Sequence, residues 1–183
     1  MTENKLIAQT SFDEKRCRHV AGSLTYVLHC HHFASLSTQL AIDCTMLDAK
    51  KLLADCSEDA FFPVLWAYYK QNNITGIKDR IEIAERYFAE AGLGKLKVKY
   101  AGLCAGEVEL KHSHLDEGWI KKWGYSSKPI NFIGCGYVTA LFSTVFGRPR
   151  RSYEAKERQS IACGANVSII TVTDVYHLEK GGL

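Results

Sequence analysis

The chain has 183 residues, of which 46% are apolar and 23% are charged, and its formal net charge is +3 at pH 7. This composition is typical of one globular domain, and so small a net charge argues against a nucleic-acid-binding protein. No apolar run is long enough to span a bilayer, and no signal peptide is apparent. Seven cysteines without a CxxC pair argue against a disulfide framework, so we expect a reducing, cytoplasmic compartment.

The chain divides into three parts of one domain. Residues 1–20 form a polar N-terminal segment that we expect to be partly disordered. Residues 21–94 are predicted to be helical, and residues 95–176 to hold the core, in which strands flank a central pair of helices. Strands and helices are thus segregated, which favours an α+β fold with helices packed on one side of an antiparallel sheet.

Four helices are predicted before the core. The first is expected over Ser23–Ile42, and a short one over Met46–Asp55. Ser57 could cap the third, in which Pro63 indicates a later start or a kink. The fourth is the clearest amphipathic helix of the chain, with its apolar residues on one stripe and Gly92 as its stop.

The first predicted helix contains the densest group of metal-ligand side chains. On a helix, His29 and His32 share one side while Cys30 and His31 point elsewhere, so the run offers two ligands to one metal at most. Candidates to complete a site are Cys44, Cys56, His112 and His114. The metal hypothesis therefore involves His29, Cys30, His32 and His114, and it allows haem or another metal as cofactor. The alternative is a set of polar helix residues around a hydrogen-bonded buried histidine.

Two strands are predicted after the fourth helix. Apolar and charged residues alternate over residues 95–100 and again over 107–112, and the lysines of one strand could pair with the glutamates of the other. His112 is in phase with Val108 and Leu110, so we expect its side chain to face inward at the mouth of the central helices. It is either a buried, hydrogen-bonded histidine or a group that contacts a ligand or metal.

The stretch His112–Pro149 is predicted to form the central pair of helices. Ser113 can cap the first helix, and Gly124 fits its stop position. Pro129 is expected to open the second helix, and Gly147 to end it.

Aromatic side chains gather on the facing stripes of these two helices. Leu115, Trp119 and Trp123 recur at four-residue spacing on the first, and Tyr137 belongs to the apolar stripe of the second. Small residues among them suit a mostly apolar pocket with a few polar groups. The alternative is a well-packed aromatic core.

Catalytic signatures are scarce. The sequence has no P-loop, GxGxxG, GxSxG or HExxH motif. Asp116 and Glu117 are adjacent in sequence and diverge on a helix, so a solvated first turn explains them better than an acid/base pair. A Cys/His nucleophile pair stays open because nothing selects one. We therefore expect a binding protein rather than an enzyme.

One pattern of residues runs through the second half of the chain. It consists of Ser113, Glu117, Trp123-Gly124, Pro129, Gly136-Tyr137 and Gly147-Arg148-Pro149. With this spacing, residues 95–173 resemble the 4-vinyl reductase domain, a small-molecule-binding family. Its fold is shared with the sensor regions of phenol- and xylene-responsive activators, with haem nitric-oxide-binding domains and with vesicle-tethering subunits. The resemblance implies the same α+β fold here.

The resemblance also implies two sets of site residues. The positions that hold phenol in the aromatic-sensing activators match Trp119 and Phe132, which favours a flatter, more apolar ligand. The positions of a structural zinc in those activators match Asn131, Glu157, Ser160 and Ser168. Asn and Ser are poor zinc ligands, so zinc is not expected there. Cys135 and Cys163 lie close by in sequence and could form a different site.

Three hypotheses remain. The first is a sensor, carrier or accessory protein that binds a small apolar or aromatic molecule between the central helices and the sheet. Its site residues would be Trp119, Phe132, Tyr137, His112 and Trp123. The second is a metal- or tetrapyrrole-binding protein or enzyme that uses the His29–His32 cluster, and the third is a structural homodimerisation module. The expected partners are an apolar molecule, a second copy and a further protein, without nucleic acid or a membrane span.

Overall fold

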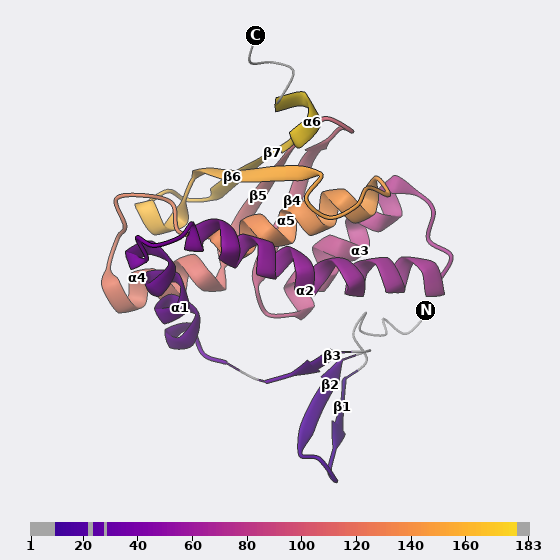
Figure 1. Ribbon diagram of the computed structural model, residues 1–183, viewed down its shortest axis with the longest axis horizontal. Coiled ribbons are helices and arrows are strands. Elements are labelled where there is room, and N and C mark those ends of the chain that lie inside the picture. The colour runs from indigo at the N-terminus through magenta and orange to yellow at the C-terminus, as the bar shows by residue number, and fades with distance from the viewer. Residues whose placement is uncertain (1–9, 22–23, 28, 179–183) are drawn as a thin grey trace.

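Figure 1 shows the computed structural model, which describes residues 10–21, 24–27 and 29–178. The first described segment is a small antiparallel sheet of three strands in sequence order, β1 (Thr10–Asp13), β2 (Arg18–Ala21) and β3 (Leu24–Tyr26). In Figure 1 this sheet lies apart from the body of the molecule. Strands therefore occupy part of the segment that was expected to be polar and partly disordered, while residues 1–9 lie outside the described part of the chain.

The body consists of helices packed on a four-stranded antiparallel sheet, which confirms the predicted α+β class. The sheet order β4-β5-β7-β6 makes β4 and β6 its edge strands. Within the described ranges, no helix is both long and apolar enough to cross a membrane. In chain order the elements are α1 (His31–Asp43), α2 (Ala49–Gln71), α3 (Ile77–Glu90), β4 (Gly94–Ala101), β5 (Ala105–Ser113), α4 (His114–Trp123), α5 (Phe132–Val145), β6 (Tyr153–Gln159), the short 3-10 helix η1 (Ile161–Cys163), β7 (Ser168–Asp174) and α6 (Val175–Leu178).

The first two helices differ from their predictions. α1 begins at His31 rather than Ser23, because Leu24–Tyr26 pairs with β2 in the small sheet. α2 is one continuous helix of 23 residues where the sequence predicts two. Ser57 lies inside this helix, and its hydroxyl donates to the Ile133 carbonyl of α5 at 2.8 Å instead of capping a helix.

The hairpin and the first central helix follow the prediction. β4 and β5 pair antiparallel, and the Ser113 hydroxyl caps α4 by accepting a hydrogen bond from the Asp116 backbone N–H at 3.2 Å. α4 ends at Gly124, whose positive φ of 78° favours glycine. α4 has a strong local signal at each end, a serine cap and a glycine stop. For this reason its bounds could be predicted from the sequence.

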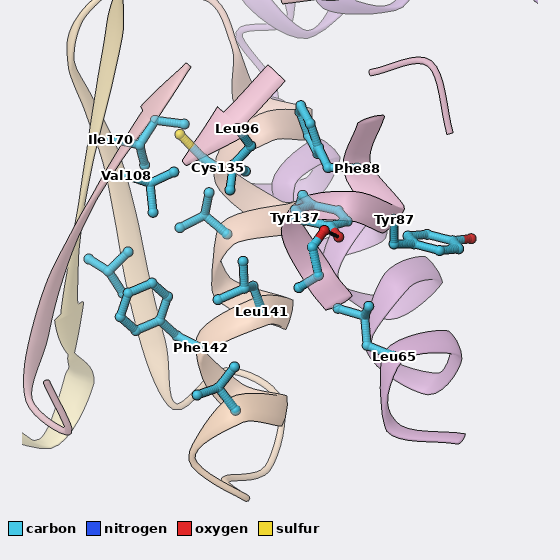
Figure 2. Close-up of a cluster of buried hydrophobic side chains, with 14 of the residues drawn as sticks. Leu65, Tyr87, Phe88, Leu96, Val108, Cys135, Tyr137, Leu141, Phe142 and Ile170 are labelled. Atoms are coloured by element: carbon cyan, nitrogen blue, oxygen red, sulfur yellow. Dashed lines mark hydrogen bonds between the residues drawn. The ribbon is translucent and has the colours of Figure 1, made fainter. Parts of the chain in front are cut away.

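α5 lies at the centre of the molecule. It begins at Phe132 rather than near Pro129, because the Asn131 side chain accepts a hydrogen bond from the Gly134 N–H at 2.8 Å and so caps the helix. All residues from Gly134 to Val145 are buried. Side chains of α5 meet those of the sheet on one side and those of α2 and α3 on the other (Figure 2).

Aromatic rings fill the middle of this core. Tyr137 packs edge-on against Phe61 of α2 and Phe88 of α3, with ring centroids 4.9 and 4.8 Å away. Edge-to-face contacts of this kind add to the stabilisation that area burial provides. The labelled members of the core in Figure 2 are Leu65, Tyr87, Phe88, Leu96, Val108, Cys135, Tyr137, Leu141, Phe142 and Ile170.

Two arginines in the loop after α5, Arg150 and Arg151, bind acids of α2. Arg150 forms an ion pair with Asp59 at 2.8 Å, and Arg151 pairs with Glu58 at 2.6 Å and Asp59 at 2.7 Å. Glu58 is only 2% exposed, so Arg151 neutralises a buried carboxylate and has a structural role. These arginines therefore fix the loop between α5 and β6 against α2, which leaves them poorly suited to contact nucleic acid.

Candidate functional site

A groove of about 1050 Å³ lies between α2 and the edge strand β6, and residues of α5 line it between them. This volume is at the upper end of what small-molecule sites use, and such sites are usually apolar with a few polar groups. The apolar part of the lining comes from Ala54, Pro129, Phe132, Cys135, Tyr153, Ala155 and Val175. The groove therefore has the size of a ligand site and an apolar surface, while charged side chains make up more than half of its lining residues.

Local structure explains why these side chains share one groove. The Asn131 cap starts α5 at Phe132, which places Phe132 and Cys135 three residues apart on one face of the helix. On β6, Tyr153 and Ala155 alternate with exposed residues, so both face the helices. Burial raises the pKa of the Cys135 thiol to about 12, so this side chain stays neutral and acts as an apolar surface.

Eleven Asp, Glu, Lys and Arg residues also line the groove, and one of them is Glu157 of β6. Its Oε2 atom accepts a hydrogen bond from the Asn131 backbone N–H at 3.2 Å. Its Oε1 atom is buried and has no hydrogen-bond partner among the described residues. Burial, followed by the negative charge of Asp116, raises the pKa of Glu157 to about 7. The site therefore contains one polar atom that the protein itself leaves unsatisfied.

A buried hydrogen-bond network lies behind Glu157. Asp116 is fully buried, and its carboxylate accepts hydrogen bonds from the Ser160 hydroxyl at 3.0 Å and the Asn131 side-chain amide at 2.8 Å. The Asn131 amide also donates to Ser113 at 3.0 Å. This network joins α4, α5 and the turn before η1, so it holds one end of the groove in place.

The side chains in this network do not suit zinc. Asn131 and Ser160 of this network, with Glu157 and Ser168, are the residues at the positions of the activators' zinc, where an amide and two hydroxyls are poor ligands. Asn131 and Ser160 use their polar atoms on Asp116, and the Ser168 hydroxyl accepts the Ile161 N–H at 2.8 Å. Across the described ranges, no three His, Cys, Asp or Glu side chains are arranged to hold a metal ion, and this includes Cys135 and Cys163.

The structure separates the side chains that the sequence predicted as ligand contacts. Phe132 lines the groove. Tyr137 is fully buried in the main core, and its hydroxyl donates to the Ala84 carbonyl at 2.6 Å. Trp119 is 7% exposed and packs in a separate small cluster that includes Ile130. A role for Trp119 and Tyr137 in binding stays a prediction, but neither side chain lines the groove.

Trp123 and His112 lie at the surface. Trp123 is 49% exposed, and its ring lies 6.3 Å from that of Trp119. The prediction that His112 faces inward is wrong, because its side chain is 72% exposed and pairs with Glu117 at 3.2 Å. A β-bulge is the reason: Lys95 pairs with His112, whereas the next residue of β4 pairs two positions back along β5, and the alternation shifts by one.

The predicted metal ligands meet at the contact between α1 and α4. α1 starts at His31, with Cys30 at its cap position, so the assumption that His29 and His32 share a helical side is wrong. Instead, the rings of His29 and His31 lie 5.9 and 6.4 Å from that of His114. Burial lowers the pKa of His114, which keeps it neutral at pH 7. The arrangement is a contact between aromatic rings, and the described residues contain no metal-type geometry there.

Sequence reasoning missed most of the groove lining. Tyr153, Ala155 and Glu157 recur at every second position of β6, which is the signal of an inward face that carries a carboxylate. The contribution of α2, including Ala54 and Glu58, had no local signal, because the contact spans more than 70 residues of sequence. The cleft arises only when these elements pack together.

No protein-family model matches this chain, and no curated protein matches it. Several solved structures share its fold. The phenol-responsive sensory domain of the transcription activator PoxR, solved with phenol, is 16% identical, with a TM-score of 0.77, over 94% of this chain and 88% of that chain. A likeness at this identity shows a shared fold.

Two further structures support the same fold. A vinyl-4-reductase family protein from Methanocaldococcus jannaschii is 12% identical, with a TM-score of 0.50, over 79% of this chain and 78% of that chain. A trafficking protein particle complex subunit 3 from Naegleria fowleri, covalently bound to palmitic acid, is 15% identical. Its TM-score is 0.53, over 79% of this chain and 93% of that chain. They match the families that the sequence pattern resembles, and this confirms the predicted fold resemblance.

Proposed function

We propose that this protein binds a small apolar or aromatic molecule in the groove between α2, α5 and β6, and acts as a sensor, carrier or accessory protein. The groove itself carries the proposal, because its volume of about 1050 Å³ is bordered by Phe132, Cys135 and Tyr153. Burial of an apolar ligand against such side chains is favourable by roughly 25 cal/mol per Å² of apolar surface.

The fold comparison supports the same class of ligand. One structure of this fold is a phenol-responsive domain solved with phenol, and another is covalently bound to palmitic acid. Both molecules are largely apolar. The seven cysteines are all unpaired, which supports the cytoplasm as the compartment. A sensor or carrier also needs a readout, and the second candidate function below supplies one.

A groove-filling variant tests the proposal. Ala54→Trp places an indole from α2 into the groove, whereas Ala60→Trp places the same side chain on an exposed part of the same helix. With ethylbenzene as the probe in isothermal titration calorimetry, we expect Ala54→Trp to weaken binding by about tenfold or more and Ala60→Trp by less than about twofold. Equal affinities for both folded variants would place the ligand elsewhere.

The second candidate function is homodimerisation through α1. This helix buries the small residues Ala34, Ser35, Thr38 and Ala41, and exposes its large apolar side chains. Phe33, Leu36 and Leu40 are 63, 47 and 62% exposed at helical spacing, and they continue into Met46 and Leu47, 95 and 54% exposed. Contiguous exposed apolar surface of this kind is typical of a protein–protein interface. We propose that a second copy of the chain covers it.

Charge substitutions on α1 test the dimer. Leu36→Glu and Leu40→Glu place carboxylates in the exposed apolar surface, and Leu103→Glu, at a side chain 48% exposed in the β4–β5 turn, is the control. Light scattering after gel filtration should give twice the 20.5 kDa chain mass for the wild type and the control, and a single chain mass for the α1 variants. A monomeric wild type would refute the dimer.

A further inference from the structure

The groove contains a carboxylate that is only half satisfied. Glu157 Oε2 accepts the Asn131 N–H at 3.2 Å, while Oε1 is hidden from solvent and has no hydrogen-bond partner within the described chain. Two hydroxyls are close to Glu157: that of Ser168 accepts the Ile161 N–H, and that of Ser160 donates to Asp116. A buried acceptor without a donor costs free energy that a ligand with an N–H or O–H group would recover.

A second buried acid lies beside this carboxylate. Asp116 is buried beside Glu157 and raises its pKa, and neither carboxylate forms an ion pair with any described Lys, Arg or His. Six basic residues line the groove, and three of them pair with acids: Lys51 with Asp55, Arg151 with Glu58 and Lys156 with Glu154. The other three, Lys50, Lys128 and Arg158, are exposed. Glu157 is therefore a lining carboxylate that has a second acid behind it and no ion-pair partner among the described residues.

We propose that the ligand of this groove is a small amine with an apolar or aromatic body, whose ammonium group donates a hydrogen bond to Glu157 Oε1. This inference rests on the proposed function, since it assigns the ligand class for the same groove. Phe132, Cys135 and Tyr153 would contact the apolar body, and the network behind Glu157 would hold the carboxylate in position.

The amine fits better than three alternatives. A hydrocarbon would fill the apolar part but leave Oε1 without a donor. An alcohol would supply the donor without the positive charge, and a charge-assisted hydrogen bond is roughly twice as strong as a neutral one. A carboxylate would bring a third negative charge next to Asp116 and Glu157, so it would bind at the basic side chains of the lining and not at Glu157.

A matched ligand series tests the inference. The probes share one phenyl body: 2-phenylethylamine, 2-phenylethanol, ethylbenzene and 3-phenylpropanoate. Calorimetry at about pH 8, with the wild type, Glu157→Gln and the control Glu82→Gln, gives the affinity of each. Glu82 lies on α3 outside the groove, where it is exposed and pairs with Lys78 at 4.0 Å. We expect the amine to bind the wild type and the control about tenfold more tightly than ethylbenzene.

The Glu157→Gln variant should lose this difference while it binds ethylbenzene within about threefold of the wild type. If ethylbenzene binds and the amine is no tighter, or if its advantage survives in Glu157→Gln, the amine assignment fails while the apolar groove stands. Tightest binding of the carboxylate would also overturn the assignment and move the polar contact to the basic side chains of the lining. If no member of the series binds, both the assignment and the proposed function fail.

Discussion

At the scale of single residues, Glu157 sets the chemistry of the groove and also gives the protein a pH dependence. Burial and the charge of Asp116 raise its pKa to about 7, whereas an unfolded glutamate titrates near about 4.3. Between these values the folded protein holds a proton that the unfolded chain has released. The contribution of Glu157 to stability is therefore present below about pH 4.3 and is lost as the pH rises through about 7.

Urea denaturation at about pH 5 and about pH 8 checks this sign. Relative to Glu157→Gln, the wild type should lose free energy of unfolding as the pH increases, because only the wild type must ionise a buried carboxyl group. Glu154→Gln should follow the wild type, since Glu154 is exposed. Parallel profiles for the wild type and Glu157→Gln would show that the carboxyl group is not shielded from solvent.

Phe132 and Trp119 distinguish the groove from the site that the sequence alone suggested. Phe132 lines the groove, whereas Trp119 packs against Ile130 and Ala162 and does not. Phe132→Ala should weaken ethylbenzene binding by about tenfold through lost apolar contact. The mild change Trp119→Phe should leave affinity unchanged within about twofold. The reverse outcome in calorimetry would restore the pocket beside Trp119.

At the scale of elements, the contact between α2 and α5 determines the shape of the groove. A Cβ atom at Gly136 would collide with the Ala54 carbonyl oxygen and with Ser57, so glycine lets the two helices approach closely. The Ala54 oxygen is a backbone atom and cannot rotate away. The separation of α2 from α5 therefore depends on one small residue, and so does the width of the groove that both helices line.

Gly136→Ala measures this close contact. Overpacking of a rigid contact costs about 1–3 kcal/mol, which should exceed the gain of up to about 1 kcal/mol from alanine's helix propensity. We expect a net loss in the free energy of unfolding by urea denaturation. Ala60→Val on the exposed face of α2 serves as the control and should change stability by less than about 0.5 kcal/mol. A stabilised Gly136→Ala protein would show that the helices can separate without cost.

Element boundaries were predictable where a local signal marks them. The Ser113 cap and the Gly124 stop fix α4 within its own sequence. Ser57 failed as a predicted cap because its hydroxyl finds a partner 76 residues away, in Ile133. His112 failed because a bulge in β5 shifts the alternation, and no residue pattern announces a bulge.

At the scale of the whole molecule, the segregation of helices and strands was enough to predict the α+β class, and the spaced pattern from Ser113 to Pro149 was enough for the fold resemblance. The groove was not predictable, because α2, α5 and β6 come together only in the packed molecule. The network around Asp116 was not predictable either. The sequence identified Asn131 and Ser160 only as matches to zinc positions of relatives, and their hydrogen bonds to Asp116 come from tertiary structure.

The central claim is that an apolar molecule binds between α2 and β6, and the location of a bound ligand tests it most directly. A crystal structure of the protein soaked with 1-bromo-4-ethylbenzene would show the bromine by its anomalous scattering. We predict an anomalous peak in the groove beside Phe132, Cys135 and Tyr153. A peak against Trp119, or only at the exposed surface of α1, would contradict the claim.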